Sequence, residues 1–158
     1  MAVSIRPVTD LEADWPALLE LLKAFDAHHL AFLEGELRPN AYERVHARFT
    51  KGLAKGRMLI LLAEDEGAAI GIASGAILKS PSMFEERVGY LNNFYIDEAH
   101  RGSTLILSFH RLIEDWFRAQ GATVMQRSVY VANERTYALW QRMGFKPYVA
   151  TLRKPLKP

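Results

Sequence analysis

Hydrophobic and polar positions along the chain follow two different periods, which predict two kinds of element. Alternation, or a short continuous apolar run between turn residues, predicts a strand. Strands are expected at Val3–Val8, Arg57–Glu64, Ala69–Leu78, Val88–Ile96, Thr123–Val131 and Phe145–Leu152. Apolar residues at helical spacing predict helices that begin at Asp14-Trp15-Pro16 and after Thr104, and helices over Ala41–Ala54 and Asn133–Met143.

The order of these elements is β-α-α-β-β-β-α-β-α-β. The turn "DEGA" joins two strands into a hairpin, which indicates antiparallel pairing in the middle of the chain. The strand–helix–strand unit from Val88 to Val131 indicates a right-handed parallel crossover. We therefore predict the α/β (α+β) class, with a mixed, mostly antiparallel central sheet and helices on both faces. The 158 residues fit one domain with its own core.

Composition narrows the function classes. The formal charge of +2 is small, and the Lys and Arg residues are dispersed, so nucleic-acid binding is not expected. The chain has no cysteine, which excludes disulfides and a cysteine nucleophile. No apolar run is long enough for a membrane span, and "MAVSIRPVTD" does not resemble a signal peptide. A cytoplasmic protein is expected, and no His/Asp/Glu cluster has the spacing of a metal site.

The stretch "HRGSTLIL", His100 to Leu107, joins a predicted strand to the most regular predicted helix. The first N–H groups of a helix have no internal partners and favour an anion, and Arg101 adds a positive charge. A pyrophosphate could bind there. Alternatively, Ser103 or Thr104 only caps the helix with its hydroxyl.

A second motif, "NERTYALWQRMGF", covers Asn133 to Phe145. Asn133 can cap a helix whose Thr136, Leu139 and Trp140 lie on one side. Gly144 can adopt the left-handed conformation that ends a helix. By itself this motif is explained as a well-capped amphipathic helix.

Together, the two motifs and their order resemble the GNAT acyltransferase superfamily, and the resemblance covers nearly the whole chain. "YLNNFYIDEAHRG" is similar to that family's central strand and pyrophosphate loop, and "ANERTYALWQRMGFKPY" to its last helix and strand. The resemblance implies acetyl transfer from acetyl-CoA to a primary amine of a small molecule or protein. It also implies a homodimer, because many proteins of this fold pair.

The resemblance further implies where the ligands bind. The cofactor would lie between two splayed strands, with the N–H groups of Phe94 and Tyr95 facing the thioester carbonyl. The implied cofactor-binding residues are Phe94, Tyr95, Ile96, Arg101, Gly102, Ser103, Thr104, Leu105, Ile106, Asn133 and Trp140. The acceptor amine would border His28, His29 and Glu34. Each of these three has a simpler interpretation, as a helix-end histidine or a solvated loop carboxylate.

Some residues depart from the family pattern. Thr104 and Ile106 occupy positions of two small residues in the pyrophosphate loop, where Cβ atoms point toward the anion. Trp140 stands where many members carry a tyrosine acid, and Asn92 where many carry a glutamate. Tyr137 is a candidate replacement acid, or packs against the sheet. Asn92, Tyr137 and Trp140 are therefore the catalytic candidates.

These departures leave alternatives open beside the enzyme. One is a GNAT-fold domain that binds a ligand or partner without acetyl transfer. Another is an α/β binding domain unrelated to acyl-CoA. Loss of an acid would only slow an enzyme, since general acid–base assistance is typically worth about 10²–10⁴-fold. Loss of cofactor binding would stop the enzyme. The substitutions at Thr104 and Ile106 therefore matter more for activity than those at the acid and base positions.

Overall fold

The computed structural model describes residues 3–33, 35–79 and 84–156, which divide into two compact units. The first unit covers residues 1–128 and the second covers residues 129–158. No helix in these described ranges combines the length and the hydropathy needed to cross a membrane.

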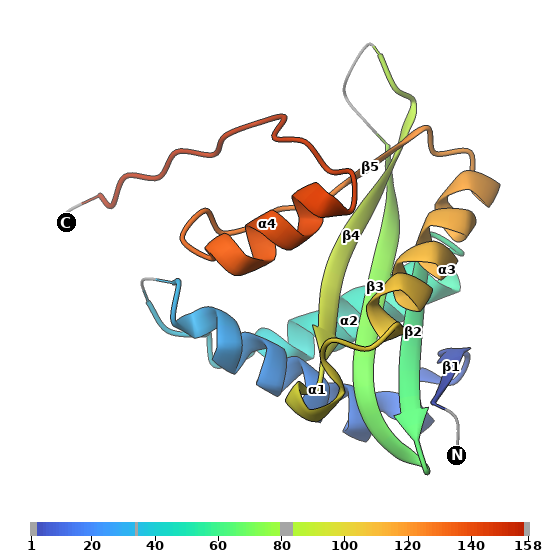
Figure 1. Cartoon of the computed structure of the whole chain (residues 1–158). Helices are drawn as coiled ribbons and strands as arrows, with labels where there is room; N and C mark the ends of the chain where they lie inside the picture. The colour runs from blue at the N-terminus through green and yellow to red at the C-terminus, as the bar shows by residue number, and fades with distance from the viewer. Residues whose placement is uncertain (1–2, 34, 80–83, 157–158) are drawn as a thin grey trace. The chain divides into compact units, whose positions relative to one another are not determined.

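The first unit contains most of the regular structure (Figure 1). Its elements are β1 (Ser4–Pro7), α1 (Leu11–Leu30), α2 (Ala41–Ala54), β2 (Met58–Asp65), β3 (Ala68–Lys79), β4 (Arg87–Ile96), the 3-10 helix η1 (Glu98–His100), α3 (Leu105–Ala119) and β5 (Val124–Gln126). The second unit contains α4 (Glu134–Arg142). The described residues form a five-stranded sheet in the order β1-β2-β3-β4-β5.

Pairing within the sheet follows the expected pattern. Strands β1 to β4 pair antiparallel with their neighbours, and β4 pairs parallel with β5 through the crossover helix α3. The prediction of a mixed, mostly antiparallel sheet is therefore confirmed. Figure 1 shows α3 in front of the sheet, with α1 and α2 behind it.

Two predicted elements differ in extent from the structure by more than one residue at an end. Helix α1 begins at Leu11 rather than at Asp14, because the Asp10 carboxylate accepts a hydrogen bond from Ala13 N at 3.1 Å and caps the helix one turn earlier. The strand expected over Thr123–Val131 is limited to β5, the three residues that pair with β4.

The expected final strand, Phe145–Leu152, is wrong: this segment has no regular secondary structure. A strand requires a pairing partner, and no described strand pairs with this segment. Pro147 also removes one backbone donor from it. Its side chains Tyr148, Val149 and Leu152 are largely exposed.

The core on the α1–α2 side of the sheet is aliphatic and aromatic. Ile60, Leu62 and Ile72 of the sheet pack against Leu18, Leu22 and Phe49 of the two helices, and all six are almost completely buried. Burying side chains of this size contributes about 1.5–3 kcal/mol each. This layer fixes α1 and α2 across one face.

The opposite face of the sheet is lined by glycines under α3. A Cβ atom on Gly89 would lie 2.4 Å from Cγ of Phe117, and one on Gly75 would lie 2.5 Å from Cζ of the same ring. A Cβ on Gly71 would lie 3.1 Å from Cε2 of Phe109. Helix α3 therefore approaches the sheet more closely than side chains larger than hydrogen would permit.

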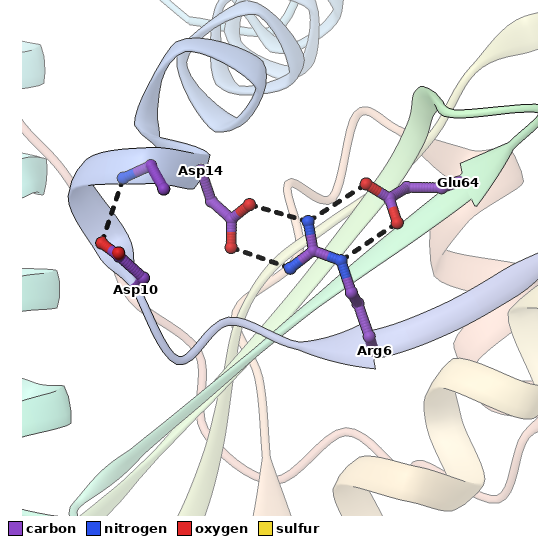
Figure 2. Close-up of polar contacts among 5 residues, drawn as sticks. Arg6, Asp10, Asp14 and Glu64 are labelled. Carbon is purple, nitrogen blue, oxygen red and sulfur yellow. Dashed lines mark hydrogen bonds and ion pairs between the residues drawn. The ribbon is translucent and has the colours of Figure 1, made fainter.

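Arg6 joins three elements of the first unit (Figure 2). Its guanidinium donates to both carboxylate oxygens of Asp14 on α1, at 2.9 and 2.7 Å, and to both of Glu64 on β2, at 3.0 and 3.1 Å. Bidentate pairs of this kind are the strong form of ion pair. The hydrogen bonds to Arg6 hold the pKa of the Asp14 carboxyl below its ordinary value, although burial opposes this.

Replacing Arg6 by methionine is expected to lower the free energy of unfolding by about 1–2 kcal/mol at neutral pH, because two carboxylates lose their shared cation. The effect stays in this range because the Arg6 side chain is 41% exposed. Since the folded-state pKa of Asp14 is depressed, its stabilisation is present above the unfolded pKa of about 3.9 and is lost as the pH falls through the folded value. Urea unfolding at several pH values should show the difference between wild type and Arg6→Met shrinking in acid. The charge-retaining variant Arg6→Lys is the control, and a difference independent of pH would contradict this account.

Candidate functional site

Strand β4 has an edge that is only partly paired. Strand β5 pairs with it at Val88, Gly89 and Tyr90, and no described residue continues the ladder beside the rest of β4. Beyond Tyr90, β4 therefore has no neighbouring strand on that side in the described part of the chain. A strand edge of this kind can accept an extended ligand as a strand does.

The direction of neighbouring N–H groups identifies the donors on this edge. Asp97 N donates to Ile70 O on β3 at 2.8 Å, and Asn93 N donates to the Ser74 hydroxyl, also on β3, at 3.2 Å. Because successive N–H groups of a strand point to opposite sides, those of Phe94 and Ile96 point to the open edge. The N–H of Tyr95 points to β3, so the expectation that the Tyr95 N–H faces the thioester carbonyl beside that of Phe94 is wrong.

The turn after β4 leads directly into α3. Gly102 has φ +81°, a left-handed conformation that favours glycine. The Ser103 hydroxyl donates to His100 O at 2.8 Å and accepts from Leu105 N at 3.3 Å, whereas Thr104 makes no capping bond with its side chain. Of the two hydroxyls that were candidate caps, Ser103 therefore caps the helix.

Helix α3 leaves backbone donors available at its beginning. Its first internal hydrogen bond is Ser108 N to Thr104 O, at 3.1 Å. The N–H groups of Ile106 and Leu107 precede that bond and have no partner within the helix. Leu105 is buried, Ile106 is partly buried and Thr104 is exposed. With the helix dipole, this end of α3 favours a negatively charged group.

The Arg101 side chain is held against the end of β4. Its Nε donates to Ile96 O at 3.0 Å, and its guanidinium carbon lies 5.6 Å from the centre of the Tyr95 ring. Glu98 lies 4.0 Å from its Nη1. A guanidinium positioned by Nε presents its terminal N–H groups in a fixed direction, which suits phosphate recognition.

His100 connects the same turn to the β2–β3 hairpin. Its Nε2 lies 3.2 Å from Oδ2 of Asp65, the last residue of β2, and its Nδ1 lies 4.0 Å from Oδ2 of Asp97. The sequence offered no role for His100 beyond that of a loop residue. The contact with Asp65 ties the turn before α3 to the β2–β3 hairpin.

The candidate acceptor histidines occupy the last turn of α1. His29 Nδ1 lies 2.8 Å from Phe25 O, and the rings of His28 and His29 meet edge to face with centres 5.7 Å apart. A histidine at this position interacts favourably with the helix C-terminus. The third acceptor candidate, Glu34, lies outside the described residues.

A partly buried acid near these histidines, Asp26, was missed from the sequence. Burial raises the pKa of the Asp26 carboxyl, although a hydrogen bond with Tyr42 and the charge of His29 oppose the shift. Burial, and secondarily Asp26, raise the pKa of Tyr42 to about 12. The signal was present, since Asp26 follows Leu22 by four residues and so shares its side of the helix.

Arg127, just after β5, was also missed. Burial lowers the pKa of its guanidinium to about 10, while the nearby Tyr90 phenol opposes that shift. The group stays charged at neutral pH. The sequence did not single out Arg127, because it lies within the predicted strand Thr123–Val131. The end of β5 at Gln126 depends on pairing, which the sequence does not show.

The second unit contains the remaining candidates. The Asn133 side chain caps α4 by accepting from Thr136 N at 3.2 Å, as predicted. Gly144 has φ +95°, and Phe145 N donates to Trp140 O at 3.0 Å, which completes the expected glycine-ended helix. The Trp140 and Phe145 rings meet edge to face at 5.4 Å. The roles of Asn133, Tyr137 and Trp140 toward a cofactor stay predictions.

Across the described ranges, no group of three or more His, Asp or Glu side chains could hold a metal ion. Near the beginning of α3, the polar groups are backbone donors, Arg101 and the polar residues of β4. Such a site suits the binding of an anion at α3 together with an extended chain along β4.

Comparison with known proteins identifies the family. The sequence profile of the acetyltransferase (GNAT) family matches residues 15–145, which is most of the chain. The chain therefore belongs to the GNAT acetyltransferase family, and the predicted superfamily is confirmed. No curated protein matches the chain in sequence.

Solved structures of similar fold support the same architecture. AAC(6')-Iy in complex with the bisubstrate analog CoA-S-monomethyl-acetylneamine is 18% identical with a TM-score of 0.75, covering 99% of this chain and 100% of that one. A predicted acetyltransferase with acetyl-CoA from Clostridium acetobutylicum is 16% identical with a TM-score of 0.76, covering 98% and 96%. Glucosamine-6-phosphate N-acetyltransferase from Arabidopsis thaliana is 18% identical with a TM-score of 0.70, covering 99% and 100%. At these identities the likeness shows the fold alone.

Proposed function

We propose that the chain is an N-acetyltransferase that transfers the acetyl group of acetyl-CoA to a primary amine of a small molecule or protein. The observation that carries the proposal is the open edge of β4, which runs directly into an anion-binding turn. Membership of the GNAT family supports it. Two of the similar structures are named with a CoA-containing analog and with acetyl-CoA, and the third is named as a glucosamine-6-phosphate N-acetyltransferase.

In this proposal, the two ends of the cofactor bind to two parts of the first unit. The pyrophosphate binds at the beginning of α3, to Arg101 and to backbone N–H groups between Gly102 and Ile106. The pantetheine arm runs along the open edge of β4 and hydrogen-bonds like an added strand. The thioester carbonyl then accepts from Phe94 N–H or Ile96 N–H.

The proposed reaction is one nucleophilic substitution. The amine lone pair attacks the thioester carbonyl carbon, so that a C–N bond forms and the carbonyl oxygen becomes an oxyanion. Backbone N–H groups stabilise that charge. The C–S bond then breaks, the thiolate of CoA leaves and gains one proton, and the nitrogen loses one proton to water. A thiol with a pKa of about 8.5 is a tolerable leaving group. Positioning the two reactants supplies about 7–11 kcal/mol of the barrier reduction.

The residues at the family's usual base and acid positions cannot transfer protons in this reaction. The Asn92 amide is not a base, and the Trp140 indole is not an acid at neutral pH. Tyr137 is the proposed donor of a proton to the thiolate. On the acceptor side, His28, His29 and Glu34 are the proposed contacts of the amine, and Asp26 adds an acid beside His29.

Calorimetry with acetyl-CoA and with CoA tests this function. Both ligands should bind, and thermal shift should report stabilisation of about 2.7 kcal/mol at a ligand concentration of one hundred times Kd. Absence of binding at millimolar acetyl-CoA would remove the enzyme proposal. A panel of amines, with release of the CoA thiol as the readout, then identifies the acceptor.

A second candidate function is a GNAT-fold domain that binds a ligand or partner without transfer. Asn92 on β4 and Trp140 on α4, neither of which can act as base or acid, favour it. The same assay separates the two. Binding of acetyl-CoA without thiol release across the amine panel supports the second candidate, whereas release with any amine supports the first.

Glycine at both Thr104 and Ile106 is expected to tighten CoA binding by about 3- to 10-fold, because it removes two branched side chains at the anion end of α3. Calorimetry with CoA measures the change. Glycine also weakens a helix by about 1 kcal/mol per residue, so Thr104→Ala/Ile106→Ala is the matched variant that removes the branches and keeps helix propensity. Unchanged or weaker binding in both double variants would contradict the steric account.

We also propose that the protein is a homodimer. The described C-terminal segment after α4 exposes Tyr148, Val149 and Leu152, and Leu156 adds a fourth apolar side chain. Exposed apolar side chains gathered in one segment favour association. Light scattering coupled to size exclusion measures the mass, and a monomer at all concentrations would refute the dimer.

A further inference from the structure

The turn that joins β4 to α3 has little packing to hold it in shape. All residues from 97 to 104 are partly or fully exposed, whereas Ile96 before them and Leu105 after them are buried. A Cβ atom on Gly102, within this turn, would meet nothing within 4 Å outside its chain neighbours. Apolar burial therefore fixes the two ends of the turn, and hydrogen bonds determine its shape between them.

His100 attaches this turn to another part of the sheet through its side chain. Its Nε2 lies 3.2 Å from Oδ2 of Asp65, the last residue of β2. Because an ionised carboxylate can only accept, Nε2 carries the hydrogen and donates it. The side chains of His100 and Asp65 are 28% and 33% exposed, so water screens their contact only in part.

Asp65 is a well-fixed anchor because it adjoins a tight hairpin turn. The two residues of that turn, Glu66 and Gly67, both have positive φ, at +50° and +84°. A two-residue turn with positive φ at both positions matches the twist of the strands on either side. Strands β2 and β3 continue from it as paired inner strands of the sheet. The position of Asp65 is therefore set by the sheet and not by the turn before α3.

His100 also links this anchor to the beginning of α3. Its carbonyl oxygen accepts from the Ser103 hydroxyl at 2.8 Å, and the Ser103 oxygen accepts from Leu105 N at 3.3 Å. A chain of contacts thus runs from Asp65 through His100 and Ser103 to the first residue of α3. Each contact in such a chain fixes the group that makes the next one.

We propose that His100 is a positioning residue for cofactor binding: its ring, held by Asp65, sets the position of the turn that carries Arg101 and leads into α3. The proposal rests on the proposed function, in which Arg101 and the first N–H groups of α3 bind the CoA pyrophosphate. His100 donates its Nε2 hydrogen to Asp65 and not to the ligand, so it acts through the turn.

The physical reason is the free energy of ordering a loop on binding. Donors that are already in place bind an anion without an ordering cost, whereas a loose turn has to be ordered by the ligand. Loss of the contact between His100 and Asp65 leaves the turn without its side-chain anchor on the hairpin. The charge of Asp65 has the opposite effect, because a carboxylate near the beginning of α3 repels an anion.

Calorimetry with CoA on two variants of Asp65 separates position from charge. Asp65→Ala removes both the anchor and the charge, and should weaken CoA binding about 3-fold although one repulsive charge is gone. Asp65→Asn removes the charge but keeps an oxygen that accepts from His100 Nε2, so its affinity should equal or exceed that of the wild type. If Asp65 acted by its charge alone, both variants would bind CoA more tightly.

Variants of His100 test the other end of the contact. His100→Ala should weaken CoA binding about 3- to 10-fold. His100→Gln, whose amide N–H can take the place of Nε2–H, should restore most of the affinity. Adding Asp65→Ala to His100→Ala should cause little further loss, because both changes remove the same contact.

His46→Ala is the matched control for loss of stability. His46 lies on α2, its side chain is also 28% exposed, and its Nε2 lies 3.0 Å from Oε1 of Glu12. This variant removes the same kind of pair far along the chain from the turn, and should leave the affinity for CoA unchanged.

Three results would overturn the inference and leave the proposed function in place. They are wild-type affinity in His100→Ala, affinity at or above the wild type in Asp65→Ala, and a loss in His46→Ala equal to that in His100→Ala. Failure of the wild type to bind CoA would overturn the proposed function, and the inference with it.

Discussion

Replacing Gly89 by alanine is expected to lower the free energy of unfolding by about 3 kcal/mol, at the upper end of the usual cost of overpacking a core. The added Cβ would lie 2.4 Å from Cγ, 2.5 Å from Cδ2 and 2.8 Å from Cδ1 of Phe117. Gly89 is not among the glycines with positive φ, so alanine adds a clash and no backbone strain. The ring cannot move toward β3, because it also lies over Gly75.

Urea unfolding of Gly89→Ala measures this cost, and Phe117→Leu is the companion variant. Leucine is smaller than phenylalanine, so the double variant should lose less stability than the sum of the two single variants. A double-mutant cycle between residues in contact gives a coupling of about 0.5–3 kcal/mol. Additive effects, or an unchanged urea midpoint for Gly89→Ala, would show that the ring can adjust.

Replacing Arg101 by alanine is expected to weaken acetyl-CoA binding by about 10- to 100-fold, which corresponds to roughly 1.4–2.8 kcal/mol. The expectation rests on the proposed function. Arg101 brings a full positive charge to the turn before α3, and its Nε bond to Ile96 O sets the direction of the guanidinium. Lysine keeps the charge but cannot bond Ile96 O and a phosphate at once, so Arg101→Lys should be intermediate.

Calorimetry with acetyl-CoA at low and at high salt tests the Arg101 prediction. The affinity of the wild type should fall more steeply with salt than that of Arg101→Ala, because the lost contact is ionic. Arg111→Ala is the matched control, since Arg111 lies on α3 with 85% of its side chain exposed and the charge change is the same. Equal effects of the two variants would show that only net charge matters.

Helices were the part of the fold that the sequence predicted best, because their signals are local. The bounds of α2 agree with the prediction, and α4 lies within one residue of it at each end. The prediction placed the start of α1 one turn too late, because it put Pro16 in the first turn of the helix. The Asp10 cap sets the actual start at Leu11. A proline beyond the first turn costs one hydrogen bond, which the packing of Leu18 and Leu22 offsets.

Strands depend on partners that are distant in sequence, and there the prediction was weaker. The Phe145–Leu152 segment has strand-like composition, but no described strand pairs with it. Strand β4 also has a β-bulge at Asn92–Asn93, which has no local signature, since it exists only in the register between β3 and β4.

The candidate site could likewise be predicted from the sequence only where its signals are local. The turn from Arg101 to Leu105 could be interpreted from its residues, and the structure adds that Ser103 rather than Thr104 caps α3. The directions of the Phe94 and Ile96 N–H groups could be assigned only from the hydrogen-bonded pairing of β4 with β3. The Asp26–Tyr42 contact required the packing of α1 against α2, which no sequence period specifies.

The glycines under α3 have a further consequence for a ligand that reaches both the helix and the open edge of β4. The rings of Phe109 and Phe117 lie directly on Gly71, Gly75 and Gly89, with no side chain between them. Helix α3 therefore cannot move closer to the sheet. In the proposed function, the pyrophosphate at α3 and the acyl group at β4 would therefore bind to two parts of the first unit whose separation is fixed by this packing.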